Sequence, residues 1–175
     1  MAVLEEVGRL LDSLRGVWDE DAVDELDHAL QSAAQALADD ADDELVLAAA
    51  LHDLAHSPLL GEVWALHHER VAQDWLTPRF GERVGWLAGA HVAAKRYLAA
   101  TDPDYATTLS DVSVASLHHQ GGAGVDWGFV DHPWWTDALR LRRYDDAAKD
   151  PRVAGASIDD VLRVAERVVV QRLSR

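Results

Sequence analysis

The sequence predicts an all-α protein. Apolar residues recur at the three- and four-residue intervals of amphipathic helices along most of the chain, and no stretch shows the alternation of a half-buried strand. Acidic residues or proline precede several of these stretches, where they favour helix starts. With 175 residues and 49% hydrophobic content, the chain can bury one substantial core, so we expect a single domain over residues 1–175.

Three helices are predicted in the first part of the chain. Residues 3–14 and 23–37 carry apolar side chains at helical spacing. Residues 43–54 form an almost uninterrupted apolar run after an acidic start, which indicates a buried helix in the middle of the domain. This helix ends on His52 and Asp53, so two polar side chains are delivered to the interior.

Five more helices follow a loop at residues 56–62. They are predicted at about residues 67–76, 82–100, 110–119, 133–149 and 158–173. Pro78 and Gly81 separate the first two, and Pro133 fits the first turn of the fourth. Three glycines within residues 121–124 indicate a flexible loop.

Composition excludes several classes of protein. A formal net charge of −15 repels a polyanion, so we expect no nucleic-acid partner. Without cysteine there are no disulfides, Cys-ligated zinc sites or iron–sulfur clusters, and a metal must be held by His, Asp, Glu or Tyr. No long uncharged apolar run or secretory signal is present, so we expect a cytoplasmic protein with no membrane partner, either a monomer or a small homo-oligomer.

The chemistry is indicated by histidines and aspartates in apolar surroundings. Burying His52 and Asp53 together is costly unless both are paired or coordinated. His28 and His91 also lie in apolar stretches, although each alone would more often be a hydrogen-bonded core residue. A divalent metal resolves the cost for the whole set. The ordered series is His28, His52, Asp53, His68, His91 and Asp145.

This order, with the segments DHALQSA, LHDLAHS, HERVAQDWL, HVAAKRYL, SLHHQGG and LRLRRYDDAAK, resembles the HD-domain superfamily over about residues 23–149. Within it, the segments look most like the mixed-valent diiron oxygenases that cleave organophosphonates. The resemblance implies two iron ions, Fe(II) and Fe(III), with O2 as co-substrate. The first ion would be held by His28, His52, Asp53 and Asp145. The second would be held by His68 and His91, with Asp53 bridging both.

The resemblance also implies a small anionic substrate, an organophosphonate. Lys95 lies one helical turn from the last of the histidine ligands, so it presents an ammonium group beside the metal. Arg142 likewise lies one helical turn from Asp145, three residues away, and its planar guanidinium group can hold two anion oxygens. Ser113 and Ser116 match the family's hydroxyl donors to the phosphonate. Surface charges and helix caps are the ordinary alternatives for these residues.

Two upstream positions depart from the family pattern. Where relatives carry a tyrosine and a glutamate before the first histidine, this chain has Trp18 and Asp21. Indole cannot ligate iron, so we expect Trp18 either to form an apolar lid on the substrate pocket or to pack in the core. Asp21 has a shorter side chain than glutamate but keeps the negative charge that would pair with a cationic amine of the substrate. Lys149 is expected to be a structural partner of Asp145.

Five histidines remain outside the predicted ligand set. His56 and His67 are interpreted as neighbours of the site or as alternatives in register. The other three are expected in loops or facing solvent, namely His118, His119 and His132.

The leading hypothesis is an oxygenase that activates O2, removes hydrogen from the carbon attached to phosphorus and breaks the carbon–phosphorus bond, giving phosphate and a carboxylic acid or aldehyde. Asp53, Lys95 and Arg142 would take the catalytic part. One alternative is a metal-dependent phosphohydrolase acting on a small phosphate ester. A third is a metal-stabilised regulatory protein without turnover.

Overall fold

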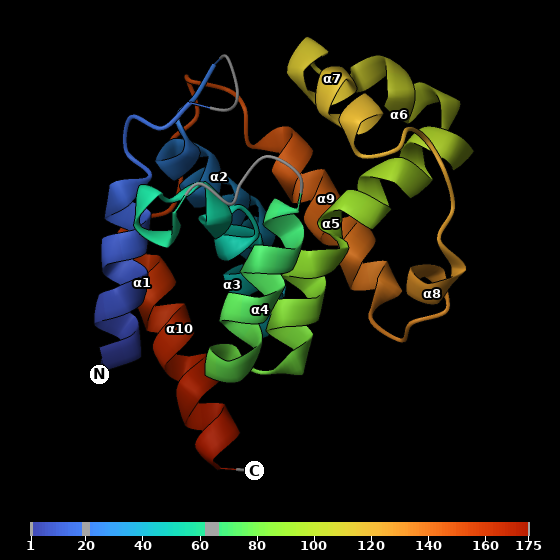
Figure 1. Ribbon diagram of the computed structural model, residues 1–175. Helices are drawn as coiled ribbons and strands as arrows, with labels where there is room; N and C mark the ends of the chain where they lie inside the picture. The colour runs from blue at the N-terminus through green and yellow to red at the C-terminus, as the bar shows by residue number, and fades with distance from the viewer. Residues whose placement is uncertain (1, 19–21, 62–66, 175) are drawn as a thin grey trace.

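The structure, a computed structural model, describes residues 2–18, 22–61 and 67–174. All regular structure in these ranges is helical, which confirms the predicted all-α class (Figure 1). The α-helices are α1 (Ala2–Ser13), α2 (Glu25–Ala38), α3 (Asp43–Leu51), α4 (His68–Phe80), α5 (Glu82–Thr101), α6 (Pro103–Thr108), α7 (Asp111–His119), α8 (Trp127–Val130), α9 (Trp135–Ala147) and α10 (Ile158–Leu173). Two short 3-10 helices, η1 (Leu54–His56) and η2 (Pro58–Leu60), follow α3.

Side-chain caps fix where several helices begin. Asp24 accepts a hydrogen bond from the backbone N–H of Asp27 at the start of α2, and Asp42 does the same for α3. Ser157 forms a reciprocal capping box with Asp160 at the start of α10. These caps satisfy N–H groups that a helix cannot pair internally.

The core is built around α3. All residues from 45 to 51 are buried, and α2, α5, α9 and α10 pack against this helix. Figure 1 shows α3 in the interior, with α1 and α10 side by side on one flank and α6 and α7 together at another end. Because α3 ends in the interior, its last turn delivers His52 and Asp53 to the centre of the molecule. No helix in the described part of the chain is both long and apolar enough to cross a membrane.

Small residues allow α4 and α5 to pack very closely. An ideal Cβ added at Gly85 would lie 2.0 Å from Thr77 Oγ1 and 3.0 Å from the backbone oxygen of Gln73. A Cβ at Gly89 would lie 2.3 Å from Gln73 Oε1. The close approach matters for the site, because α4 begins with His68 and α5 carries His91.

Several helices differ from the sequence expectation. Helix α4 continues through Pro78 to Phe80, and both Pro78 and Asp74, whose carbonyl group loses its helical hydrogen bond to proline, are exposed. Helices α6 and α8 were not predicted, since each is too short to show an apolar period. Helix α9 starts at Trp135, two residues after Pro133.

Candidate metal centre and anion pocket

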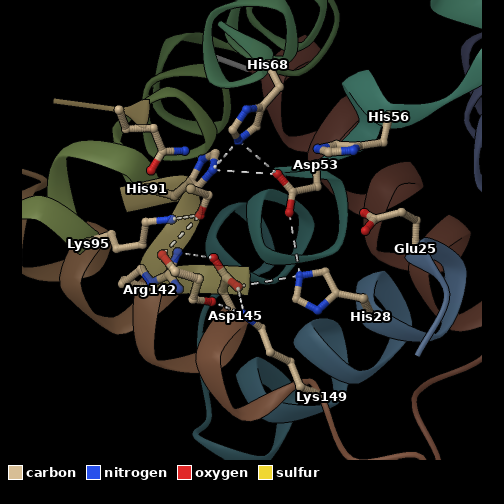
Figure 2. Close-up of a pocket in the computed structure, with 13 residues that line it drawn as sticks. Glu25, His28, Asp53, His56, His68, His91, Lys95, Arg142, Asp145 and Lys149 are labelled. Carbon is tan, nitrogen blue, oxygen red and sulfur yellow. Dashed lines mark hydrogen bonds and ion pairs between the residues drawn. The ribbon is translucent and has the colours of Figure 1, made fainter. Parts of the chain in front are cut away.

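A polar cavity lies where α2, α4, α5, α7 and α9 surround the end of α3 (Figure 2). Its lining consists almost entirely of ionisable and hydrogen-bonding side chains: Glu25, His28, Asp53, His56, His68, His91, Lys95, Ser113, Ser116, Gln120, Arg142, Asp145 and Lys149. His52 is 1% exposed and completes the cluster. The six residues of the predicted ligand series therefore come together from separate helices.

Three of the four clustered histidines are oriented by backbone carbonyl groups. In each, Nδ1 lies within hydrogen-bond distance of a carbonyl oxygen, so Nδ1 carries the proton and the Nε2 lone pair faces the cluster. The pairs are His28 with Ala148 (3.0 Å), His52 with Ala49 (2.9 Å) and His91 with Ala88 (2.6 Å). This orientation is the usual one for a histidine that binds a metal through Nε2.

The carboxylate of Asp53 divides its two oxygens between two histidine pairs. Oδ2 lies 3.0 Å from His52 Nε2 and 3.6 Å from His28 Nε2. Oδ1 lies 3.5 Å from His68 Nε2 and 3.6 Å from His91 Nε2. Figure 2 shows Asp53 between His68 and His28. One carboxylate thus faces two separate groups of nitrogen atoms.

Asp145 completes the first group. Its Oδ1 lies 3.5 Å from His28 Nε2, and its Oδ2 lies 3.4 Å from His52 Nε2. The Nε2 atoms of His28 and His52 thus each lie within 3.6 Å of both carboxylates, and two nitrogens with two carboxylates are a donor set that suits iron, manganese or zinc.

The unpaired atoms of the cluster test whether cations fit. His52 Nε2 and Asp53 Oδ1 are buried and have no hydrogen-bond partner among the described residues. His68 Nε2 and His91 Nε2 lie only 3.0 Å apart, and His91 already uses Nδ1 to donate to a carbonyl group. In the absence of metal His68 Nε2–H can donate to the lone pair of His91 Nε2, and a cation bound to both nitrogens beside Asp53 would replace that proton. The residues present therefore fit metal ions in both groups.

The electrostatics of the cluster also favour positive charge. Burial opposes ionisation of Asp53 and Asp145, but His52 beside the first, and Arg142 and His52 beside the second, hold each pKa well below its usual range. Burial also opposes a charge on His52, yet both carboxylates raise its pKa well above the usual value. At His91 burial dominates and lowers the pKa, so this imidazole is neutral and able to coordinate.

Two lysine–serine pairs form a cationic wall beside the cluster. Lys95 Nζ donates to Ser116 Oγ at 2.7 Å, and Lys149 Nζ donates to Ser113 Oγ at 2.9 Å. Lys95 is 4% exposed; its burial, and then the nearby charges of Arg142 and Lys149, lower its pKa to about 8. A buried ammonium group among other cations favours binding of an anion.

Arg142 is engaged differently from the sequence expectation. Its Nη1 donates to Asp145 Oδ2 at 2.7 Å, while Nε and Nη2 hold the carboxylate of Asp146. Nε also donates to the hydroxyl of Tyr105 at 3.0 Å. The bidentate fork expected to face the substrate is therefore occupied by Asp146, and the observed contact of Arg142 with the site is its hydrogen bond to Asp145.

Of the two upstream residues, only Trp18 lies within the described part of the chain, and it does not line the cavity. Its side chain is 63% exposed, so the structure supports neither the lid nor the core interpretation. Asp21 lies outside the described residues. His67 is exposed, whereas His68 faces the site, which resolves the choice of register.

Glu25 and Gln120 take positions that sequence reasoning did not give them. His56, in contrast, was expected beside the site and Lys149 beside Asp145, from whose Oδ1 its Nζ lies 4.0 Å. Glu25, one turn before His28, lines the cavity and is 2% exposed. Gln120 and Lys149 line it as well, and the ring of His56 lies 5.3 Å from that of His68. The spacing of Glu25 from His28 on one helix face could have indicated its position.

The last three histidines lie away from the metal cluster. His118 and His119 are exposed, as expected. His132 lies in the loop between α8 and α9, also as expected, and stacks on Trp86 with ring centroids 3.9 Å apart.

The fold and the site define a helical metal-binding protein with a buried His/Asp centre next to an anion pocket. No family model matches the chain. It is 37% identical over 154 residues to a hydroxymethylphosphonate dioxygenase of Gimesia maris, an alignment covering 81% of this chain and 74% of that protein. The chain therefore belongs to the family of phosphonate dioxygenases.

Two further relatives span much of the chain. A glycine-betaine-forming 1-hydroxy-2-(trimethylamino)ethylphosphonate dioxygenase of Leisingera caerulea is 29% identical, covering 81% of each chain. An uncharacterised protein of Acanthamoeba polyphaga mimivirus is 31% identical, covering 71% of this chain and 62% of that protein.

Proposed function

We propose that this chain is a dioxygenase that uses O2 to cleave the carbon–phosphorus bond of a small organophosphonate at a pair of iron ions. The observation that carries the proposal is that the two carboxylate oxygens of Asp53 face different histidine pairs. A carboxylate whose two oxygens face two nitrogen groups is suited to bridge the ions of a dinuclear centre. The dioxygenase names of the relatives from Gimesia and Leisingera support the reaction.

The proposed ligands fall into two sets that share Asp53. The first set is His28, His52, Asp53 and Asp145, and the second is Asp53, His68 and His91. Bound iron would supply the site for O2 and the oxidising power to remove hydrogen from the carbon next to phosphorus. The second set has fewer protein ligands, which leaves coordination positions for substrate and O2.

The protein's own contribution is to bind and orient the anion. The ammonium groups of Lys95 and Lys149, each hydrogen-bonded to a serine hydroxyl, lie on the wall next to the ligand cluster. A phosphonate dianion held there would place its carbon near the ligand cluster. Arg142 holds Asp145 by a hydrogen bond, so we assign it a positioning role.

The test combines iron content, O2 uptake and phosphate release, with hydroxymethylphosphonate as the first substrate. Atoms balance when one phosphonate and one O2 give one formate and one phosphate. We expect equal uptake of O2 and release of phosphate by iron-loaded protein, and no phosphate under nitrogen. His118→Ala, at an exposed position, is the control for handling. Phosphate release without O2 would overturn the proposal in favour of a hydrolase.

A further inference from the structure

Ser113 and Ser116 of helix α7 and Gln120 at its C-cap present polar side chains to the cavity. Ser113, Ser116 and Gln120 are spaced by three and four residues, so they lie one above another along the helix, and all three line the cavity. The two serines are paired with Lys149 and Lys95. Gln120 is the next position along the same face, about 5.4 Å further by the pitch of a helix.

Gln120 is partly exposed, but its side-chain oxygen is buried and has no hydrogen-bond partner among the described residues. A buried amide oxygen is unfavourable unless it is paired, so a group that donates a hydrogen bond to it is favoured at this point of the cavity. The two serines differ, because their hydroxyls already accept hydrogen bonds from lysines.

Gln120 also forms the boundary between two cavities. It lines the metal-side cavity, whose volume is about 40 Å³, and a neighbouring cavity of about 260 Å³ that Arg96 and Phe129 also line. The inner cavity alone therefore accommodates only a small substrate. Removing the side chain between them would join the two spaces.

The backbone beyond Gln120 is held firmly. Gly121 and Gly122 adopt φ values of 96° and 74°, which turn the chain directly after α7. Arg96 Nε donates to the carbonyl oxygen of Gly122 at 2.9 Å, and the N–H of Gly124 donates to the carbonyl oxygen of Arg96 at 3.0 Å. Arg96 follows Lys95 directly, so one turn of α5 fixes both the cationic wall and the end of α7.

We propose that Gln120 is a specificity-determining residue. Its carboxamide closes the inner cavity, and its oxygen accepts a hydrogen bond from a hydroxyl or amine on the organic part of the substrate while the lysine–serine pairs hold the phosphonate. This inference rests on the proposed function for the identity of the substrate. Gln120 thereby selects small phosphonates that carry a hydrogen-bond donor near phosphorus.

Two substitutions separate the two effects of Gln120. Gln120→Leu keeps most of the volume but removes the acceptor, so kcat/KM for hydroxymethylphosphonate should fall about tenfold or more with no gain for a bulkier substrate. Gln120→Ala also joins the cavities. The ratio of kcat/KM for 1-hydroxy-2-(trimethylamino)ethylphosphonate to that for hydroxymethylphosphonate should therefore rise about tenfold.

Dissociation constants of both phosphonates are measured in parallel under nitrogen by calorimetry, with His118→Ala as the control variant. If the wild type binds phosphonates without turning them over, the proposed function fails while the binding ratio still tests Gln120. An unchanged ratio in Gln120→Ala together with unchanged affinity in Gln120→Leu overturns the inference. Loss of folding in one variant leaves the other to decide.

Discussion

Among single residues, Asp53 is the most constrained in position, because both of its carboxylate oxygens face histidine nitrogens. Asp53→Ala removes a ligand from both groups, so we expect it to lose most of the bound metal. His91→Ala removes a ligand from the second group only, so we expect about half of the wild-type metal content. Elemental analysis after reconstitution and desalting measures the difference. Equal losses in the two variants would contradict a bridging role for Asp53.

Lys95 gives the anion pocket a pH dependence. Burial together with Arg142 and Lys149 lowers its pKa to about 8, so the free pocket loses this ammonium charge as the pH rises through that value. A bound anion stabilises the charged form, and the affinity for inorganic phosphate should therefore weaken by about tenfold per pH unit above about pH 8. Calorimetric titrations between pH 7 and 10 test this.

The matched variant for that titration is Lys95→Arg. A guanidinium stays charged throughout this range, so the variant should show a much flatter profile, even if its affinity at pH 7 is lower. A wild-type affinity that stays constant to pH 10 would show that Lys95 does not contact the anion.

The proposed ligand series could be picked out of the sequence because histidines and aspartates in apolar helices are rare and their order is informative. The partners of Arg142 could not. Tyr105 lies 37 positions earlier in the sequence on a helix that shows no periodicity, whereas Asp146 stands only four residues from Arg142, and nothing in the spacing says that it takes the guanidinium fork. Local spacing places a side chain on a helix face, but only packing decides which neighbour it meets.

Among the helices, the close packing of α4 against α5 leads to a prediction about stability. Gly85→Ala places a Cβ 2.0 Å from Thr77 Oγ1 and 3.0 Å from a backbone oxygen, which forces the helices apart and should destabilise the fold by about 1–3 kcal/mol. The matched control is Gly8→Ala in α1, where the nearest atom is 3.8 Å away. Improved helix propensity should make that variant neutral or stabilise it by up to about 1 kcal/mol.

Denaturant unfolding of the metal-free protein compares the two glycine variants. Because α4 and α5 carry His68 and His91, Gly85→Ala should also weaken retention of the second ion more than that of the first. If Gly85→Ala is as stable as Gly8→Ala, the helices do not pack as closely as described.

The same two helices show why boundaries are harder to predict than elements. Their apolar periods were visible, but Pro78 was interpreted as a terminator, and the actual end at Gly81 depends on a φ of 106° that favours glycine. Whether proline ends a helix depends on whether the freed carbonyl group meets water, and that is a property of the packed molecule.

For the whole molecule, the ligands tie together segments that are distant in sequence. His28 lies on α2, His91 on α5 and Asp145 on α9, while His52 and Asp53 follow the central α3. Metal ions that bind the folded state alone therefore stabilise the entire bundle. An ion at a hundredfold excess over its dissociation constant contributes about 2.7 kcal/mol, which for a chain of this size corresponds to roughly 5–10 °C in Tm.

Removing metal with a chelator should accordingly lower Tm, and the gap should depend on pH. Without metal, Asp53 and the other carboxylate raise the pKa of His52 despite its burial, so a proton stabilises the metal-free fold at the same point. That stabilisation is fully present below the unfolded pKa of histidine, about 6.5, and is lost as pH rises through the raised folded value. Protons also compete with the metal for histidine nitrogens, so the difference in Tm between metal-loaded and metal-free protein should shrink as pH falls from 8 to 6.

Calorimetric melts of both forms measure this difference in Tm, with Asp53→Ala as the variant in which chelation changes little. A gap that is absent at pH 8, or that widens on acidification, would show that these ligands do not couple metal binding to the stability of the fold.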